Sequence, residues 1–163
     1  MDGVNYILIC KNAAFVVILS ASFFLFDGCS SGTRRGKISG EGKREKIVST
    51  ANKYLGVKYK MGGTTPSGFD CSGYVMYVYH VNGLDLPRTA SGQFLEGRKI
   101  NIGTARPGDL VFFKTSSKRF SHVGIYLGNN RFIHSPRTGK KVSQAEMSNS
   151  YWKKRFVGAV TYF

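Results

Sequence analysis

The sequence places one strongly apolar helical stretch ahead of four β-type runs that are joined by short turns. The stretch at residues 72–80 (SGYVMYVYH) has apolar side chains on nearly every helical face, so the helix it forms must be buried. The later runs are rich in β-branched and aromatic residues, and they cover residues 109–113, 122–127, 131–135 and 157–163. Short connections favour antiparallel neighbours. The order predicts an α+β fold, with N-terminal helices packed on an antiparallel β-sheet meander.

Two further helices and one loop are predicted around the buried helix. Apolar residues recur at helical spacing from about Gly42, and Gly56 is a suitable helix end (the positions are Ile47, Val48, Ala51, Tyr54 and Leu55). Residues 60–68 (KMGGTTPSG) have the composition of a loop. A short polar helix is expected at residues 90–95.

The first residues are similar to a bacterial lipoprotein signal peptide. Residues 13–26 form an apolar core of 14 residues, short of the ~20 that a membrane-spanning helix needs, and Cys29 follows closely. This resemblance implies a signal peptide at 1–28, a lipid on Cys29, a flexible tether at 29–41 and a domain at 42–163 in the cell envelope. The alternative is an uncleaved membrane anchor formed by residues 4–26.

The cysteine count then isolates one thiol. Of Cys10, Cys29 and Cys71, the first would be removed with the signal and the second would carry lipid. Cys71 would have no partner for an intramolecular disulfide. A single thiol in an oxidising compartment is either buried and inert or kept for its chemistry.

Cys71 lies where a nucleophile could be activated. Asp70 is a suitable N-cap, so Cys71 falls in the first turn of the buried helix. Unpaired N–H groups and the helix dipole favour a thiolate there, which predicts a lowered thiol pKa, and the same N–H groups could stabilise an oxyanion. The small neighbours Ser72 and Gly73 leave room for a substrate carbonyl.

The three histidines differ in whether they can serve this thiol. His80 is ~13 Å away along the same helix, too far to act. His122 and His134 lie on consecutive strands and share a face if the hairpin loop has an odd residue count. A loop at 127–129 puts His134 opposite His122, and a loop at 128–130 puts it one diagonal step away. We therefore expect Cys71 as nucleophile, His122 as general base and acid, and His134 as the group that orients His122.

Five segments carry a resemblance to a known family. The segments YKMGGTTPSGFDCSG (59–73), LPRTASGQ (86–93), RPGDLVFF (106–113), SHVGIYLG (121–128) and RFIHS (131–135) are similar to the NlpC-type family of papain-like bacterial cell-wall cysteine peptidases. The resemblance implies a papain-like core and a catalytic set of Cys71, His122 and His134. It also implies that Tyr59 helps to bind substrate or to stabilise the oxyanion, and that Asp70 and Ser72 shape the pocket. It implies no metal and no organic cofactor.

The same resemblance implies a substrate. The family hydrolyses peptide bonds in peptidoglycan stem peptides, and the layout of signal, short tether and bare domain favours D-alanyl–diamino acid cross-links. The γ-D-glutamyl–diamino acid bond is the alternative substrate. The alternative functions are an acyltransferase that uses the same residues and a non-catalytic wall-binding module. The net charge of +15 suits acidic envelope polymers. A nucleic-acid partner is not expected for an exported chain, and the oligomeric state is left open.

Overall fold

The computed structural model describes residues 40–117 and 120–163. The expected signal peptide at 1–28, the lipidation site Cys29 and the alternative anchor at 4–26 lie outside the described residues and stay predictions. Within the described ranges, no helix combines the length and apolar character needed to cross a membrane.

The described part of the chain contains both helices and short strands. The helices are α1 (Gly40–Lys53), α2 (Cys71–His80), α3 (Ala90–Glu96) and α4 (Ser150–Lys153), with a 3-10 turn, η1, at Ile102–Thr104. The strands are β1 (Thr64–Thr65), β2 (Gly68–Phe69), β3 (Arg98–Ile100), β4 (Leu110–Phe113), β5 (His122–Gly128), β6 (Arg131–His134), β7 (Ser143–Glu146) and β8 (Phe156–Thr161). The predicted α+β class is confirmed. The sequence pattern missed β3, β7 and α4, which are short and largely polar. It also missed the small sheet of β1 and β2, because residues 60–68 were expected to form a loop.

The main sheet is antiparallel and has the strand order β3-β8-β4-β5-β6-β7. The predicted meander is present in β4 to β7. The last strand departs from it, because β8 returns to lie between β3 and β4 instead of beside β7. Residues near the C-terminus therefore pair next to the centre of the sheet.

The β5–β6 hairpin brings the two histidines to one face. Ile125 pairs with Ile133, so His134 lies across from Gly124, one diagonal step from His122. The register at the histidines is that of the second prediction, but the three-residue loop predicted at 128–130 is wrong, because Gly128 pairs with Arg131 and the loop has two residues. Asn129 and Asn130 both have positive φ, 50° and 56°, as a tight two-residue turn requires, and an irregularity between Tyr126 and Gly128 restores the odd parity.

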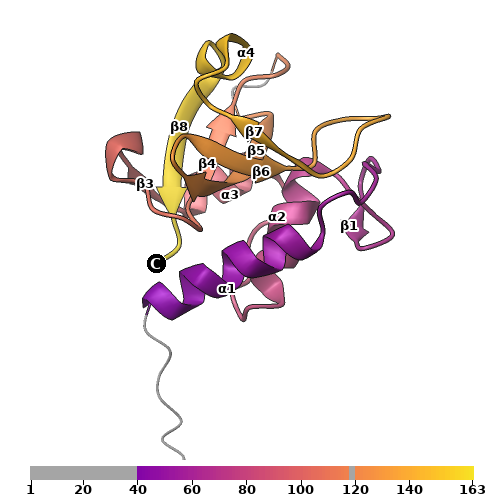
Figure 1. The fold of residues 1–163 in the computed structure, drawn as a ribbon, viewed down its shortest axis with the longest axis horizontal. Coiled ribbons are helices and arrows are strands. Elements are labelled where there is room, and N and C mark those ends of the chain that lie inside the picture. The colour runs from indigo at the N-terminus through magenta and orange to yellow at the C-terminus, as the bar shows by residue number, and fades with distance from the viewer. Residues whose placement is uncertain (1–39, 118–119) are drawn as a thin grey trace, which may run out of the picture. The chain divides into compact units, whose positions relative to one another are not determined.

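The helices α1 and α2 lie together on one side of the sheet, and α4 lies at the far end of it (Figure 1). The core between them consists of fully buried apolar side chains from both layers, among them Ile47, Ala51, Val75, Val78, Tyr79, Leu110, Val123 and Ile125. The other face of the sheet has its own cluster, which includes Phe113, Phe132 and Trp152. The active-site candidates lie between these two clusters.

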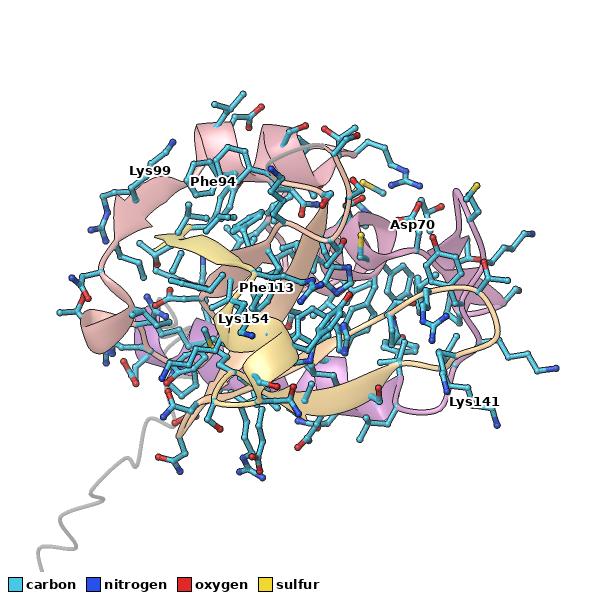
Figure 2. All side chains as sticks on the ribbon, turned by 90° about the horizontal axis from the view of Figure 1, so that it is seen from above. Asp70, Phe94, Lys99, Phe113, Lys141 and Lys154 are labelled. Atoms are coloured by element: carbon cyan, nitrogen blue, oxygen red, sulfur yellow. The ribbon has the colours of Figure 1, made fainter. Side chains whose placement is uncertain are left out.

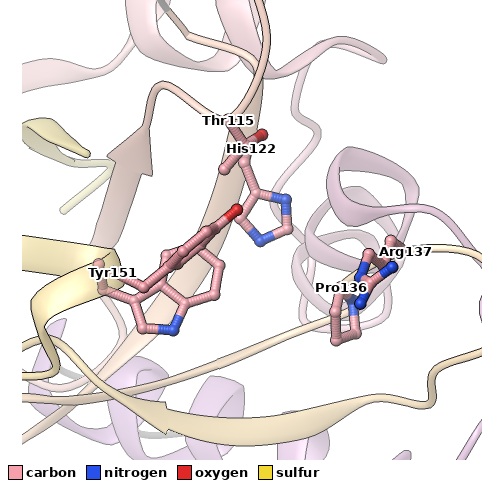
Figure 3. Close-up of a pocket in the computed structure, with 6 residues that line it drawn as sticks. Thr115, His122, Pro136, Arg137 and Tyr151 are labelled. Carbon is pink, nitrogen blue, oxygen red and sulfur yellow. The ribbon is translucent and has the colours of Figure 1, made fainter. Parts of the chain in front are cut away.

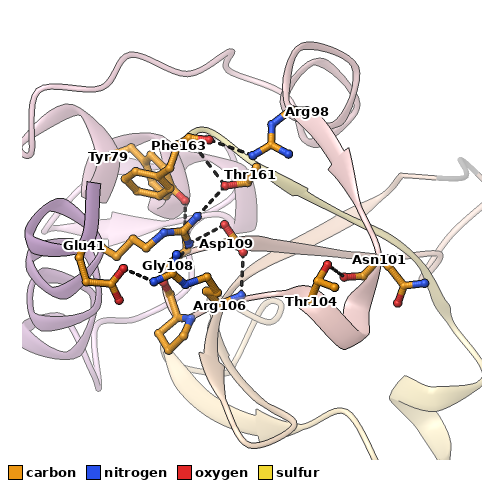
Figure 4. A network of polar contacts seen from close by, with 12 residues as sticks. Glu41, Tyr79, Arg98, Asn101, Thr104, Arg106, Gly108, Asp109, Thr161 and Phe163 are labelled. Carbon is orange, nitrogen blue, oxygen red and sulfur yellow. Dashed lines mark hydrogen bonds and ion pairs between the residues drawn. The ribbon is translucent and has the colours of Figure 1, made fainter. Parts of the chain in front are cut away.

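A buried ion pair fastens α1 to the sheet (Figure 4). Arg44 Nη1 donates to Asp109 Oδ1 at 2.7 Å, and its Nη2 donates to Thr161 Oγ1 at 2.9 Å. The two charged side chains are 8% and 2% exposed. Glu41 and Arg106 form a second pair nearby, but those side chains are more than half exposed.

We expect Asp109→Asn to destabilise the domain by about 3–5 kcal/mol, because it leaves the Arg44 guanidinium buried without its counter-charge. Urea unfolding of the full chain measures the loss. The matched control is Glu41→Gln, which breaks the exposed pair and should cost less than about 1 kcal/mol. Equal effects of the two variants would contradict the role assigned to the buried pair.

Candidate active site

The N-terminus of α2 is held by the side chain of Asp70. Its Oδ1 accepts a hydrogen bond from the Gly73 N–H at 2.7 Å, and its Oδ2 accepts one from the Gly62 N–H at 3.0 Å. The predicted N-cap is therefore confirmed. Gly73 is required at this place, because a Cβ there would lie 2.1 Å from the Gly63 carbonyl oxygen. Cys71 is thus fixed in the first turn, against the preceding loop.

Arg88 completes this end of the site, and the sequence analysis gave it no role. Its Nη1 donates to Asp70 Oδ1 and to Ser72 Oγ, both at 3.1 Å, and its Nη2 donates to Asp70 Oδ2 at 2.5 Å. The carboxylate raises the pKa of Arg88. Arg88 stands within the segment LPRTASGQ, whose resemblance to the family was the one available signal. Its contacts partly offset the negative charge of Asp70 beside Cys71.

The Cys71 thiol lies against the start of β5. Sγ is 4.0 Å from the Ser121 carbonyl oxygen, and the Val123 N–H also hydrogen-bonds to the thiol. Ser121 and Val123 are the two neighbours of His122 in the chain. The tertiary fold thus brings the nucleophile to the strand residues that flank the expected base.

The thiol pKa moves opposite to the sequence-based prediction. Burial raises the pKa of Cys71, and the negative charge of Asp70 raises it further. The N–H groups of Val123, Ser72 and Cys71 lower the pKa, as a helix N-terminus should, but burial outweighs them. The prediction of a lowered pKa is wrong for the unliganded site, where the thiol is favoured over the thiolate.

His122 and His134 form a buried pair. His122 Nε2 lies 2.7 Å from His134 Nδ1, and the two residues are 4% and 3% exposed. Burial lowers the pKa of His122 to about 4. Burial, with the neighbouring charge of His122, lowers the pKa of His134 to about 2. Both imidazoles are therefore neutral at pH 7.

Three aromatic rings pack around this pair and limit its exposure to water. The Trp152 ring stacks on His122, with centroids 5.4 Å apart and planes at 24°, and meets His134 edge-on at 5.0 Å. Phe132 lies 4.8 Å from His134, and Phe113 lies 4.8 Å from Phe132. Trp152 belongs to α4, one of the elements that the sequence pattern missed. No periodicity or motif pointed to it.

The remaining predicted residues take different places. Tyr59 is half-buried, and the charges of Cys71 and Asp70 add to burial in raising its pKa, which puts its phenol near both. Ser72 is buried and its hydroxyl faces Asp70 and Arg88. His80 is exposed and pairs with Asp85 at 2.7 Å. It lies at the opposite end of α2 from Cys71, as expected.

The candidate residues line two neighbouring hollows. One, of about 630 Å³, is lined by Asp70, Cys71, Ser72, Arg88 and Ser121, among others. The other, of about 590 Å³, is lined by Thr115, His122, Pro136, Arg137, Tyr151 and Trp152 (Figure 3). No three His, Cys, Asp or Glu side chains of residues 40–117 and 120–163 are grouped to ligate a metal ion.

The buried histidines predict a pH-dependent stability. Their folded-state pKa values lie below the ordinary 6.5, so the unfolded chain binds more protons once the pH falls below 6.5. The stability is complete above about pH 6.5 and is lost as the pH falls toward 4, by up to about 1.4 kcal/mol per pH unit for each histidine. Urea unfolding between pH 7 and 4 measures the slope.

His122→Leu removes one of the two buried titrating groups and should reduce that slope. Identical slopes in wild type and His122→Leu would contradict the assignment.

Trp152 is expected to maintain the low pKa of His122. Trp152→Ala admits water to the imidazole and should raise the His122 pKa from about 4 toward 6.5, which NMR of the ring protons measures. The conservative control, Trp152→Phe, keeps an aromatic cover and should move the pKa less. A His122 pKa that is unchanged in the alanine variant would refute this role.

Comparison with known proteins identifies the family of this chain. The NlpC/P60 family matches residues 56–161. The gamma-DL-glutamyl hydrolase of Bacillus subtilis is 45% identical over 115 residues, which cover 69% of this chain and 28% of that protein. The murein DD-endopeptidase MepH of Escherichia coli is 41% identical over 110 residues, which cover 64% of this chain and 41% of that protein. The chain spans less than half the length of these relatives.

A solved structure extends the agreement to the fold. The crystal structure of an NlpC/P60 family protein from Bacillus cereus matches 73% of this chain and 40% of that one, with a TM-score of 0.69 and 30% identity. The expected papain-like core is confirmed by this likeness. With the family match across most of the described residues, the chain belongs to the NlpC/P60 family.

Proposed function

We propose that the chain is a cysteine peptidase that hydrolyses peptide bonds in the stem peptides of peptidoglycan. The observation that carries this proposal is the neutral His122–His134 pair, buried beside a thiol that contacts both neighbours of His122. A merely structural cysteine needs no such pair. The relatives named for murein and glutamyl hydrolysis support the same reaction class.

The hydrogen bond between the histidines is compatible with either ring as donor, and we propose the tautomer in which His122 donates. With both rings neutral, His122 Nε2–H donates to His134 Nδ1, which leaves His122 Nδ1 as the acceptor for the thiol proton. His134 thus orients His122 and stabilises the imidazolium that forms. In this role His134 itself is neither protonated nor deprotonated during the reaction.

Acylation begins from the neutral thiol and imidazole. As Sγ attacks the scissile carbonyl carbon, His122 takes the thiol proton and the carbonyl oxygen becomes an oxyanion. The Cys71 N–H and the Tyr59 hydroxyl are the donors proposed for that oxyanion. The C–N bond then breaks, His122 gives its proton to the leaving amine, and a thioester remains.

Hydrolysis reverses the roles. His122 takes a proton from water, the hydroxide attacks the thioester carbon, and the C–S bond breaks as the thiol regains the proton. The network of Asp70, Ser72 and Arg88 is proposed to bind the acyl side of the substrate, since it lines the same hollow as Cys71. No metal or organic cofactor enters these steps.

The bond proposed is the D-alanyl–diamino acid cross-link, with the γ-D-glutamyl–diamino acid bond as the alternative. One relative is named a murein DD-endopeptidase and the other a gamma-DL-glutamyl hydrolase. The lipoprotein-like layout of residues 1–41 favours the cross-link. We also propose that a lipid on Cys29 holds the enzyme on a bacterial membrane, facing the wall.

Digestion of purified peptidoglycan, with products identified by mass spectrometry, tests the proposal. We expect the full chain to release peptide fragments whose masses identify the bond, and Cys71→Ala to lose at least about a thousandfold in rate. His80→Ala, at an exposed histidine outside the site, should digest like wild type.

Wall binding without digestion by wild type and Cys71→Ala alike would favour a binding module and overturn the enzyme assignment. Loss of activity in His80→Ala would contradict the placement of His80 outside the site.

A further inference from the structure

The two sides of the site differ in charge. On the nucleophile side, the carboxylate of Asp70 is matched by the guanidinium of Arg88. On the His122 side, the hollow is lined by one charged side chain, that of Arg137, and by no carboxylate. A second hollow that shares Pro136, Arg137 and Trp152 adds Lys140 and Lys141, again without an acidic residue. The His122 side is therefore cationic and uncompensated.

Arg137 stands at the edge of this hollow. It is exposed, and it follows Pro136 in the loop after β6, where its carbonyl oxygen accepts a hydrogen bond from the Lys140 N–H at 3.0 Å. None of the ion pairs found among the described residues involves Arg137. Figure 3 shows His122 between Tyr151 on one side and Arg137 with Pro136 on the other. The guanidinium thus faces the space beside the base.

In the proposed mechanism, the space beside His122 is where the leaving group lies. His122 protonates the amine that leaves, so the residue carrying this amine must lie beside His122. The hollow lined by His122, Arg137 and Trp152 is the one that fits. The Arg137 guanidinium in this hollow would therefore contact the substituent that lies next to the amine on the leaving residue.

We propose that Arg137 forms a carboxylate subsite, which binds a free carboxylate on the carbon that bears the leaving amine. The proposal rests on the proposed peptidase function and sharpens its substrate. In a D-alanyl–diamino acid cross-link, that carbon carries a carboxyl group outside the peptide chain. In the γ-D-glutamyl bond of an intact stem, the corresponding carboxyl is used in the next peptide bond. The subsite therefore selects the cross-link.

The side-chain type suits this role. A guanidinium binds a carboxylate through two parallel N–H···O bonds, and the fork geometry fixes the direction of the bound group. The carboxylate would then hold the leaving amine in line with His122. Lys141, four residues further on, lines only the second hollow and offers a matched charge outside the subsite. Figure 2 shows Lys141 at the same end of the view as Asp70, with Lys99 at the other.

Two matched peptides test the subsite in the full chain. Both contain the D-alanyl–diamino acid bond, and the carboxyl next to the scissile amine is free in one and a carboxamide in the other. We expect wild type to cleave the free acid with a kcat/KM about tenfold higher or more. Arg137→Met should lose this preference by slowing only the free acid, and Arg137→Lys should keep part of it. Lys141→Met should retain the full preference.

A binding measurement separates the subsite from the reaction. Trp152 is the single tryptophan of the chain and lines the same hollow, so its fluorescence reports occupancy. The probes are the free diamino acid and its carboxamide, titrated into Cys71→Ala with and without Arg137→Met. Selective binding of the free acid that Arg137→Met abolishes is the expected result.

The outcomes distinguish the two proposals. Cleavage of both peptides at equal rates, or a preference that survives Arg137→Met, overturns the carboxylate subsite and leaves the peptidase standing. Cleavage of neither peptide, with selective binding that depends on Arg137, overturns the reaction and supports the subsite. Neither cleavage nor selective binding overturns both.

Discussion

The packing of α2 on β5 is the contact on which the site depends, because it joins a helix N-terminus to the first residue of a strand. Val75, Val78 and Tyr79 of α2 are fully buried against a sheet whose inner face includes Val123 and Ile125. Since Cys71 begins the helix and His122 begins the strand, this one interface sets their separation. Any shift of α2 along β5 would move the thiol away from the base.

Polar bonds restrict that shift where the packing alone could not. The Ser135 hydroxyl, next to His134, donates to the Phe69 carbonyl oxygen at 2.7 Å, two residues before Cys71. The Gln93 amide donates to the Ser72 carbonyl oxygen at 3.0 Å, which ties α3 to the first turn of α2. The helix start is thereby held from the sheet and from α3 together. Directional bonds of this kind select one register among apolar packings of similar free energy.

Burial sets the charge state of the site, with consequences for how the chemistry begins. The thiol pKa is raised and both imidazole pKa values are lowered, so the resting groups are neutral. In the proposed mechanism, proton transfer from Cys71 to His122 accompanies attack, so the resting site holds a thiol that is less easily oxidised than a thiolate. Arg88 acts in the opposite direction, because it offsets the Asp70 charge that raises the thiol pKa.

The sequence by itself determined the elements whose signals are local. The composition of α2 and the Asp70 cap can each be read within about a dozen residues, and the structure agrees with both. The shared face of His122 and His134 was also expected, but it depends on a strand irregularity that the loop-length argument did not contain. Local spacing could not decide the direction of the Cys71 pKa, because desolvation depends on the strand packed against the thiol. Local spacing also could not identify Arg88 or Trp152. Arg88 reaches the site from the loop before α3, and Trp152 reaches it from α4, near the end of the sequence. Helix capping and strand alternation act between near neighbours, whereas solvent exclusion and charge pairing exist only once the tertiary fold has closed.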